Sequence, residues 1–126
     1  MTYPWNQRVG AVLPSSDTYF NLEQALNELL AGGKGLSTAT LSNVSSSASS
    51  VSLLASNSNR KGSVFFNDST AILYLAFAAT ASTTSFTYRL TPNSTLELYG
   101  EKNFTGAISG IWASANGAAR ITELTV

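Results

Sequence analysis

The chain has 126 residues, with seven basic and seven acidic side chains, and it contains no histidine and no cysteine. Its zero net charge gives no basic stripe of the kind that nucleic-acid binding requires, so we expect no nucleic-acid partner. The missing residue types exclude Ser-His-Asp and Cys-His catalysis and most zinc sites, so we expect neither an enzyme nor a cofactor.

Only 11% of the residues are charged, against roughly a quarter in average proteins. Ser and Thr fill the polar positions, and such a neutral surface favours a protein that is assembled on something over a lone monomer. No window approaches the length of a transmembrane helix, and the N-terminus lacks the basic start and apolar run of a signal peptide. We therefore expect no membrane partner.

Residues 1–20 show no sustained periodicity, and two prolines favour an extended backbone. The segment is nevertheless too apolar for a free disordered tail. It predicts an extended arm that packs either on its own domain or on a neighbouring subunit or scaffold. Large aromatic side chains suit such anchoring, and the candidates in the arm are Tyr3, Trp5, Tyr19 and Phe20.

Residues 21–31 contain the one clear helix pattern. Asn21 can cap this helix, Gln24 completes a capping box, and Gly32-Gly33 stops it. Its apolar positions form one stripe, namely Leu22, Ala25, Leu26, Leu29 and Leu30. Because a helix this short is marginal in water, we expect the stripe to pack against its own β-domain or against a partner.

From residue 34 on, short runs with strand character alternate with turn residues. Residues 38–44 and 51–55 predict two strands, joined by a serine-rich turn or a linker over Ser45–Ser50. The further expected strands are 63–67, 72–78, 85–90, 95–99, 107–113 and 118–126. Short strands at close, regular spacing indicate an all-β sandwich or barrel.

Three local patterns refine this expectation. Asn116-Gly117 is the strongest two-residue hairpin signal, and it predicts pairing of residues 108–113 with 118–124. Gly106 and Gly110 indicate a bulge or a close backbone approach. Residues 72–78 are apolar on both faces, so this strand is central, or its second face is covered by the helix or a neighbour.

Two groups of side chains have both a structural and a functional interpretation. Arg60-Lys61 predicts a solvated turn or an ion pair with Asp68 or a C-terminal acid, and the alternative is contact with a neighbouring acidic surface. Trp112, with Tyr88 and Tyr99, predicts core or cross-strand aromatics, and the alternative is a platform on which sugars stack.

Several motifs between Val51 and Val126 form a recognisable series. They are Leu53-Leu54-Ala55, Asn57, Asn59-Arg60-Lys61-Gly62, Phe66-Asn67-Asp68-Ser69, Leu73-Tyr74-Leu75, Gly110-Ile111-Trp112 and Asn116-Gly117-Ala118-Ala119-Arg120-Ile121-Thr122-Glu123. This series resembles a small β-domain common in tailed-bacteriophage proteins. With it we expect an all-β fold, namely a β-sandwich or jelly-roll-like domain over residues 37–126, preceded by an extended arm and one short helix over residues 1–36.

The resemblance implies a structural virion protein. We expect a decoration or cement protein on the outer surface of the phage head, bound to the major capsid protein as a homotrimer, with a dimer as the alternative. The second hypothesis is a head-fibre, tail or receptor-binding module that recognises host surface glycans. We assign capsid contact to the four arm aromatics named above, and contact between copies to Ile72 and Tyr74.

Overall fold

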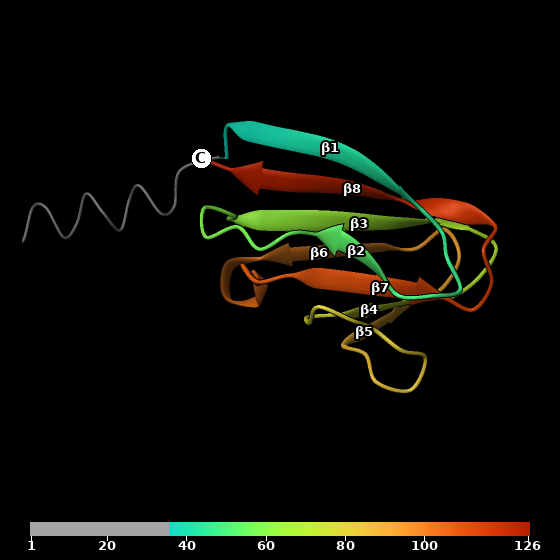
Figure 1. Ribbon diagram of the computed structural model, residues 1–126. Helices are drawn as coiled ribbons and strands as arrows, with labels where there is room; N and C mark the ends of the chain where they lie inside the picture. Colours follow the sequence, from blue (N-terminus) through green and yellow to red (C-terminus); the bar gives the residue numbers. More distant parts are fainter. Residues whose placement is uncertain (1–35) are drawn as a thin grey trace, which may run out of the picture. The chain divides into compact units, whose positions relative to one another are not determined.

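The computed structural model describes residues 36–126, which form a unit of their own (Figure 1). The predicted arm and helix lie outside the described residues, and so do the proposed contact residues Tyr3, Trp5, Tyr19 and Phe20. Within residues 36–126 the only helix is the single 3-10 turn η1 (Gly100–Lys102), and the regular structure is otherwise β. The prediction of an all-β domain is therefore confirmed.

The strands occur close to the positions that the sequence predicts. In chain order they are β1 (Thr38–Ser45), β2 (Val51–Leu54), β3 (Gly62–Ser69), β4 (Leu73–Ala76), β5 (Tyr88–Leu90), β6 (Thr95–Tyr99), β7 (Ile108–Trp112) and β8 (Gly117–Thr125). The largest differences are at β4 and β5, which are shorter than expected.

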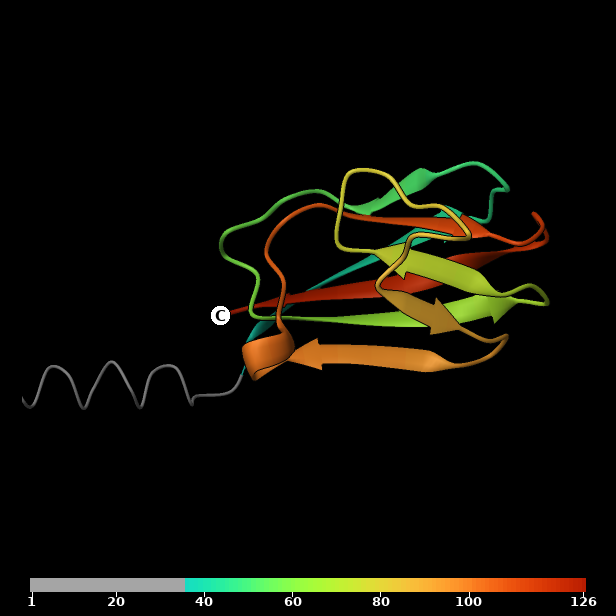
Figure 2. The same cartoon turned by 90° about the horizontal axis from the view of Figure 1, so that it is seen from below.

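Two antiparallel four-stranded sheets contain these strands, in the orders β1-β8-β3-β6 and β2-β7-β4-β5 (Figures 1 and 2). Every connection between consecutive strands changes sheet except that between β4 and β5, which pair with each other. Both sheets contribute to one hydrophobic core, because apolar side chains alternate along the strands. Its buried members are Leu53, Phe65, Ala71, Leu73, Leu75, Leu90, Leu98, Ile108, Trp112, Ala119 and Ile121.

The predicted hairpin at Asn116-Gly117 is wrong, because β7 and β8 lie in different sheets. β8 already pairs with β1 on one side and β3 on the other, so no edge is left for β7. Gly117 lacks the positive φ of a hairpin turn. A Cβ there would instead collide with Ser69, 2.6 Å from its Cβ. Asn116 donates from Nδ2 to Thr70 Oγ1 at 2.6 Å.

The serine-rich segment between β1 and β2 connects the sheets and is not a linker. Ser46 N–H donates to the Gly117 carbonyl at 2.9 Å, and the Ser47 carbonyl accepts from Trp112 N–H at 2.8 Å. One end of the segment is thus bonded to β8 and the next residue to β7. Of the two alternatives for Ser45–Ser50, the turn between two strands is the correct one.

Gly110 confirms the prediction of a close approach inside the core. A Cβ at this position would lie 2.8 Å from Leu53 Cδ1 and 2.9 Å from Leu73 Cδ1. The register of β2 with β7 also shifts between Ser52 and Leu54. The absent side chain at Gly110 therefore leaves room over β7 for the side chains of Leu53 and Leu73.

Candidate interaction surface

Arg60 is fully buried, so the solvated-turn alternative for this residue is wrong. Its Nε donates to Glu123 Oε2 at 2.8 Å, which confirms the alternative of an ion pair with a C-terminal acid. Its terminal nitrogens donate to the backbone carbonyls of Ala55, Phe104 and Gly106. The guanidinium group thus joins β8 to two loops that are distant in sequence.

Two asparagines complete this cluster. Asn57 Nδ2 donates to the same Glu123 oxygen at 3.2 Å, and Asn103 Nδ2 donates to the Arg60 carbonyl at 2.6 Å. A buried charge is tolerated only when it is paired and hydrogen-bonded, and both conditions are met at Arg60. The cluster therefore stabilises the fold, and the guanidinium group is not exposed to a ligand.

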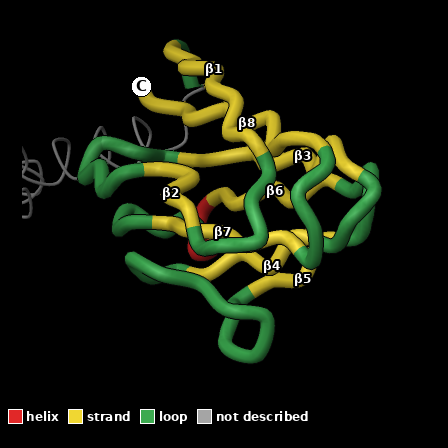
Figure 3. Tube along the Cα trace, turned by 45° about the vertical axis from the view of Figure 1, so that its right-hand side comes forward, coloured by secondary structure: helices red, strands yellow, loops and turns green. Residues whose placement is uncertain are grey.

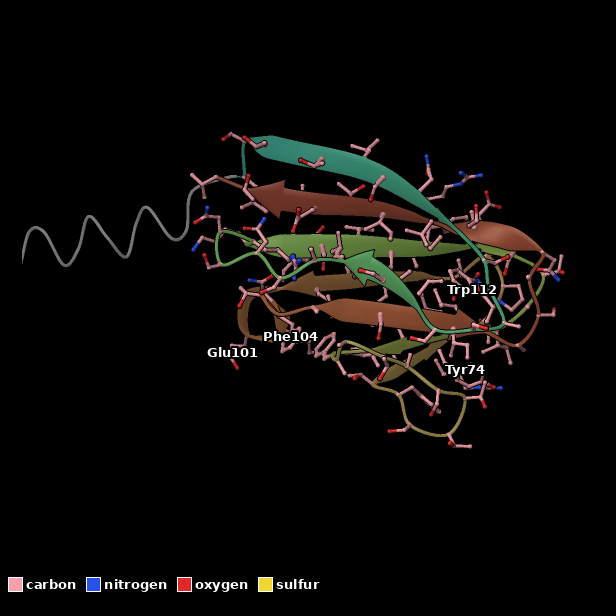
Figure 4. The ribbon with its side chains drawn as sticks, viewed as in Figure 1. Tyr74, Glu101, Phe104 and Trp112 are labelled. Atoms are coloured by element: carbon pink, nitrogen blue, oxygen red, sulfur yellow. The ribbon has the colours of Figure 1, made fainter. Side chains whose placement is uncertain are left out.

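A second buried polar group surrounds Asn67. Its Nδ2 donates to the carbonyls of Ala71 and Leu90, at 2.8 and 3.0 Å. Its Oδ1 accepts from Ser69 Oγ at 2.7 Å and from Trp112 Nε1 at 3.1 Å. Trp112 is only 1% exposed and points into the core (Figure 4). The core interpretation of Trp112 is confirmed, and a sugar-stacking platform that includes it is wrong.

Several residues that carry the sequence resemblance therefore belong to the two polar clusters around Arg60 and Asn67. They include Arg60, Asn67, Ser69, Trp112 and Glu123. Their identities are explained by hydrogen bonds and burial within the domain. A functional surface has to be sought among other residues.

The outer side of sheet β1-β8-β3-β6 carries apolar side chains in register. Val64 and Leu41 both lie beside Thr122, and Phe66 lies beside Arg120. We call this side the open face, and its large apolar members are Leu41, Val64, Phe66, Tyr99 and Leu124.

Exposure on the open face is unusually high for such residues. Leu41 is 76% exposed and Tyr99 is 43% exposed. The Tyr99 ring covers Gly62 on the neighbouring strand, where a Cβ would lie 2.6 Å from its Cδ1. Val64, Phe66 and Leu124 are half-buried. Leu41 and Tyr99 lie on the two edge strands of the sheet, and the half-buried residues lie on the strands between them. This exposed apolar surface is a candidate interaction site.

Charged groups share the open face with these apolar residues. Arg120 Nη2 and Asp68 Oδ2 are 2.9 Å apart at one end, with side chains 52% and 45% exposed. Glu97 lies on the edge strand β6 and is exposed. Apolar and charged groups thus occur together on this face, as they do in protein–protein interfaces.

The outer side of the other sheet is covered by the chain itself. The segment between β4 and β5 crosses it, and Ala81 N–H donates to Ser50 Oγ at 2.9 Å, next to the far edge strand β2 (Figure 3). Ser109 and Ala76, on this outer side, are only 1% and 5% exposed. β4 lies between β7 and β5, so the prediction of a central strand is confirmed, and the cover on its outer side comes from the domain's own loop.

Tyr74 and Ile72 lie beside this cover. The rings of Tyr74 and Phe86 are tilted, with centroids 4.9 Å apart. Tyr74 and Ile72 are both half-buried. Phe86 lies before β5 and is 40% exposed, whereas Leu90 in β5 is buried in the core. Contact between copies through Ile72 and Tyr74 stays a prediction, with less apolar surface than the open face offers.

A polar pocket of about 380 Å³ opens at one end of the domain. Its lining consists of Thr40, Asn57, Asn59, Lys61, Glu123, Thr125 and Val126. Glu123 Oε2 is occupied by Arg60 and Asn57, whereas no described residue donates to Oε1. The pocket thus combines an acceptor carboxylate oxygen with amide, hydroxyl and ammonium groups, which can hydrogen-bond a hydroxyl-rich ligand.

Comparisons of the chain with family models, with curated proteins and with solved structures found no match. Among residues 36–126, no group of three or more His, Cys, Asp or Glu side chains is placed to hold a metal ion. In the same part of the chain, no helix has the length and apolar character to cross a bilayer.

The open face was not predicted from the sequence. Strand alternation places Val64 and Phe66 on one face, but it does not show which residues of other strands lie beside them. The available signal was that both alternating sets are apolar in β3 and β8, as Phe65 and Ile121 face the core while Phe66 and Leu124 face outward. Which strands are neighbours was needed to turn this signal into a surface.

Proposed function

We propose that the chain is a structural virion protein of a tailed bacteriophage, a decoration or cement protein on the outside of the head. The observation that carries the proposal is the open face, a sheet surface with apolar side chains that no other segment of residues 36–126 covers. Its partner in the proposal is the major capsid protein. Binding across adjacent shell subunits stabilises the assembled shell by mass action.

The strand order supports a jelly-roll sandwich within this proposal. The jelly roll is an architecture of eight strands in two sheets, common in viral capsid domains. The orders β1-β8-β3-β6 and β2-β7-β4-β5, with all but one connection changing sheet, agree with that architecture. Because one fold serves many functions, the surface carries the functional argument and the fold only agrees with it.

The size of the open face limits what it does alone. Four strands about 4.8 Å apart and about five residues long span on the order of 15 by 17 Å, or roughly 250 Å² of flat area. A stable interface buries about 800 Å² per partner. A second contact region is therefore needed, and the proposal assigns it to the arm with Tyr3, Trp5, Tyr19 and Phe20.

The first test is the copy number of the protein in purified virions, measured by quantitative mass spectrometry against the major shell protein. A simple ratio to the shell protein is the expected result. A few copies per particle would place the protein at a tail, neck or vertex. Absence from the particles would overturn the proposal.

The second test separates the two contact regions. Binding to heads is measured for the full chain, for a chain without residues 1–20, for Leu41→Ser with Val64→Thr, and for the combination. We expect the deletion and the open-face double variant each to weaken binding, and their combination to abolish it. Leu36→Ser, outside the sheet and 38% exposed, is the matched control. Undiminished binding of the open-face variant would exclude this face as the docking site.

The polar pocket favours one second function, recognition of host surface glycans by a head-fibre, tail or receptor-binding module. Its hydroxyl, amide and carboxylate groups replace the aromatic platform that the burial of Trp112 removes. A glycan array followed by titration calorimetry tests it. Asn59→Ala should abolish any specific binding without a change in stability, while Thr95→Ala on the open face should leave it intact. An array without hits would reject this function.

A further inference from the structure

β1 is an edge strand whose second side has no partner among residues 36–126. It is eight residues long, contains neither a charged residue nor a proline, and pairs with β8 without a shift of register. Natural edge strands are usually protected by short length, charge, proline or a bulge. Without such protection β1 offers a row of backbone donors and acceptors to another strand.

The other three edges of the two sheets are protected. β2 has four residues and a register shift against β7. β5 has three residues and carries Arg89. β6 carries Glu97 and runs directly into η1. The absence of protection is therefore specific to β1 and is not a general property of the domain.

We propose that β1 pairs with β1 of a second copy of the chain, antiparallel about a two-fold axis at Leu41. Two copies with the same edge can satisfy one another only through such a symmetric contact. The uncharged sequence Thr38–Ser45 brings no like charges together in this arrangement. The proposal goes beyond the proposed function, because the pairing needs no virion.

The backbone of β1 fixes which residues face the second copy. Ser46 N–H donates to the Gly117 carbonyl in line with the register of β1 and β8. Hydrogen-bonded pairs alternate along an antiparallel ladder, so the N–H and C=O groups of Ala39, Leu41 and Asn43 point away from β8. These three residues supply about six hydrogen bonds when the axis passes through Leu41.

The side chains agree with the same register. Residues directly opposite in a sheet lie on the same side, so outer residues must face outer residues. The axis at Leu41 places Leu41, which is 76% exposed, opposite Leu41 of the second copy. It also places Ala39 opposite Asn43 of the second copy. The result is one sheet of eight strands with both open faces on the same side, which doubles the docking surface.

Single cysteines test this register in the full chain, which has no cysteine of its own. Leu41→Cys should form a disulfide-linked dimer under mild oxidation, since opposite Cα atoms lie about 5.5 Å apart. Asn43→Cys, on the same strand and face, should not, because its two copies are separated by about four residues of strand, roughly 13 Å. Cross-linking of Asn43→Cys alone, or of neither variant, overturns the proposal.

Charge exchange provides an independent test by sedimentation velocity. Leu41→Lys and Leu41→Glu should each weaken self-association by about tenfold or more, because like charges oppose each other across the axis. A mixture of the two should restore a dimer. A parent chain that is monomeric at every concentration, or trimeric, overturns the proposal, as does a mixture that stays monomeric. The assay uses purified chain alone, so its outcome is separate from that of the virion experiments.

Discussion

The cluster around Arg60 and the open face depart in opposite directions from the usual distribution of residues. The cluster holds a fully buried arginine, whereas the open face leaves a leucine 76% exposed. Around Arg60, carbonyls and a carboxylate from separate segments satisfy the buried charge. No described segment covers the apolar surface around Leu41. The first region therefore accounts for stability, and the second is available for association.

Loss of the buried charge should have the largest effect on stability. Arg60→Met removes the partner of Glu123 and leaves three carbonyls without their donor. Breaking a buried pair from one side costs about 3–5 kcal/mol. We expect the free energy of unfolding, measured by urea denaturation, to fall by that amount. A loss below about 1 kcal/mol would show that the cluster does not stabilise the domain as described.

The second-largest effect is expected in the other buried polar group. Trp112→Phe removes the indole N–H that donates to Asn67 and leaves a small cavity in the core. We expect a loss of about 2 kcal/mol in the same assay. Tyr99→Phe, on the open face, serves as control and should change stability by less than about 0.5 kcal/mol. Equal effects of the two variants would contradict the difference in burial.

The exposed ion pair on the open face should matter much less than the buried one. Arg120→Met removes the partner of Asp68, and both side chains are about half exposed. Surface pairs contribute about 0–1 kcal/mol, and added salt screens them further. The same Arg→Met substitution at positions 60 and 120 therefore compares a buried ion pair with an exposed one, and each pair has one member on β8. Similar losses at the two positions would refute the distinction.

The smallest effect on stability should come from the most exposed leucine. Leu41→Ser changes a side chain that is 76% exposed, so the free energy of unfolding should change by less than about 0.5 kcal/mol. Self-association and head binding should nevertheless both decrease, as measured by sedimentation and co-sedimentation with heads. A clear loss of stability would mean that Leu41 belongs to the core and not to a docking surface.

The positions of most strands were predicted from the sequence, because strand alternation and turn residues are patterns of residues that are close in sequence. The pairing of β7 with β8 failed because the Asn116-Gly117 signal contains no information about the competing partners β1 and β3. The burial of Arg60 was not predicted, because charged side chains are ordinarily exposed. The ion pair with a C-terminal acid was one of two predicted alternatives, and the other acid, Asp68, pairs with Arg120 instead.

The position of β8 has a consequence for how the protein is made. It is the last strand of the domain, yet it lies between β1 and β3, as the partner of β1 and one of the two partners of β3. During synthesis, β1 and β3 emerge from the ribosome long before the strand that joins them. Until residues 117–125 have emerged, β1 therefore has no partner in its sheet and β3 can pair only with β6, so the sheet is completed only when β8 is available.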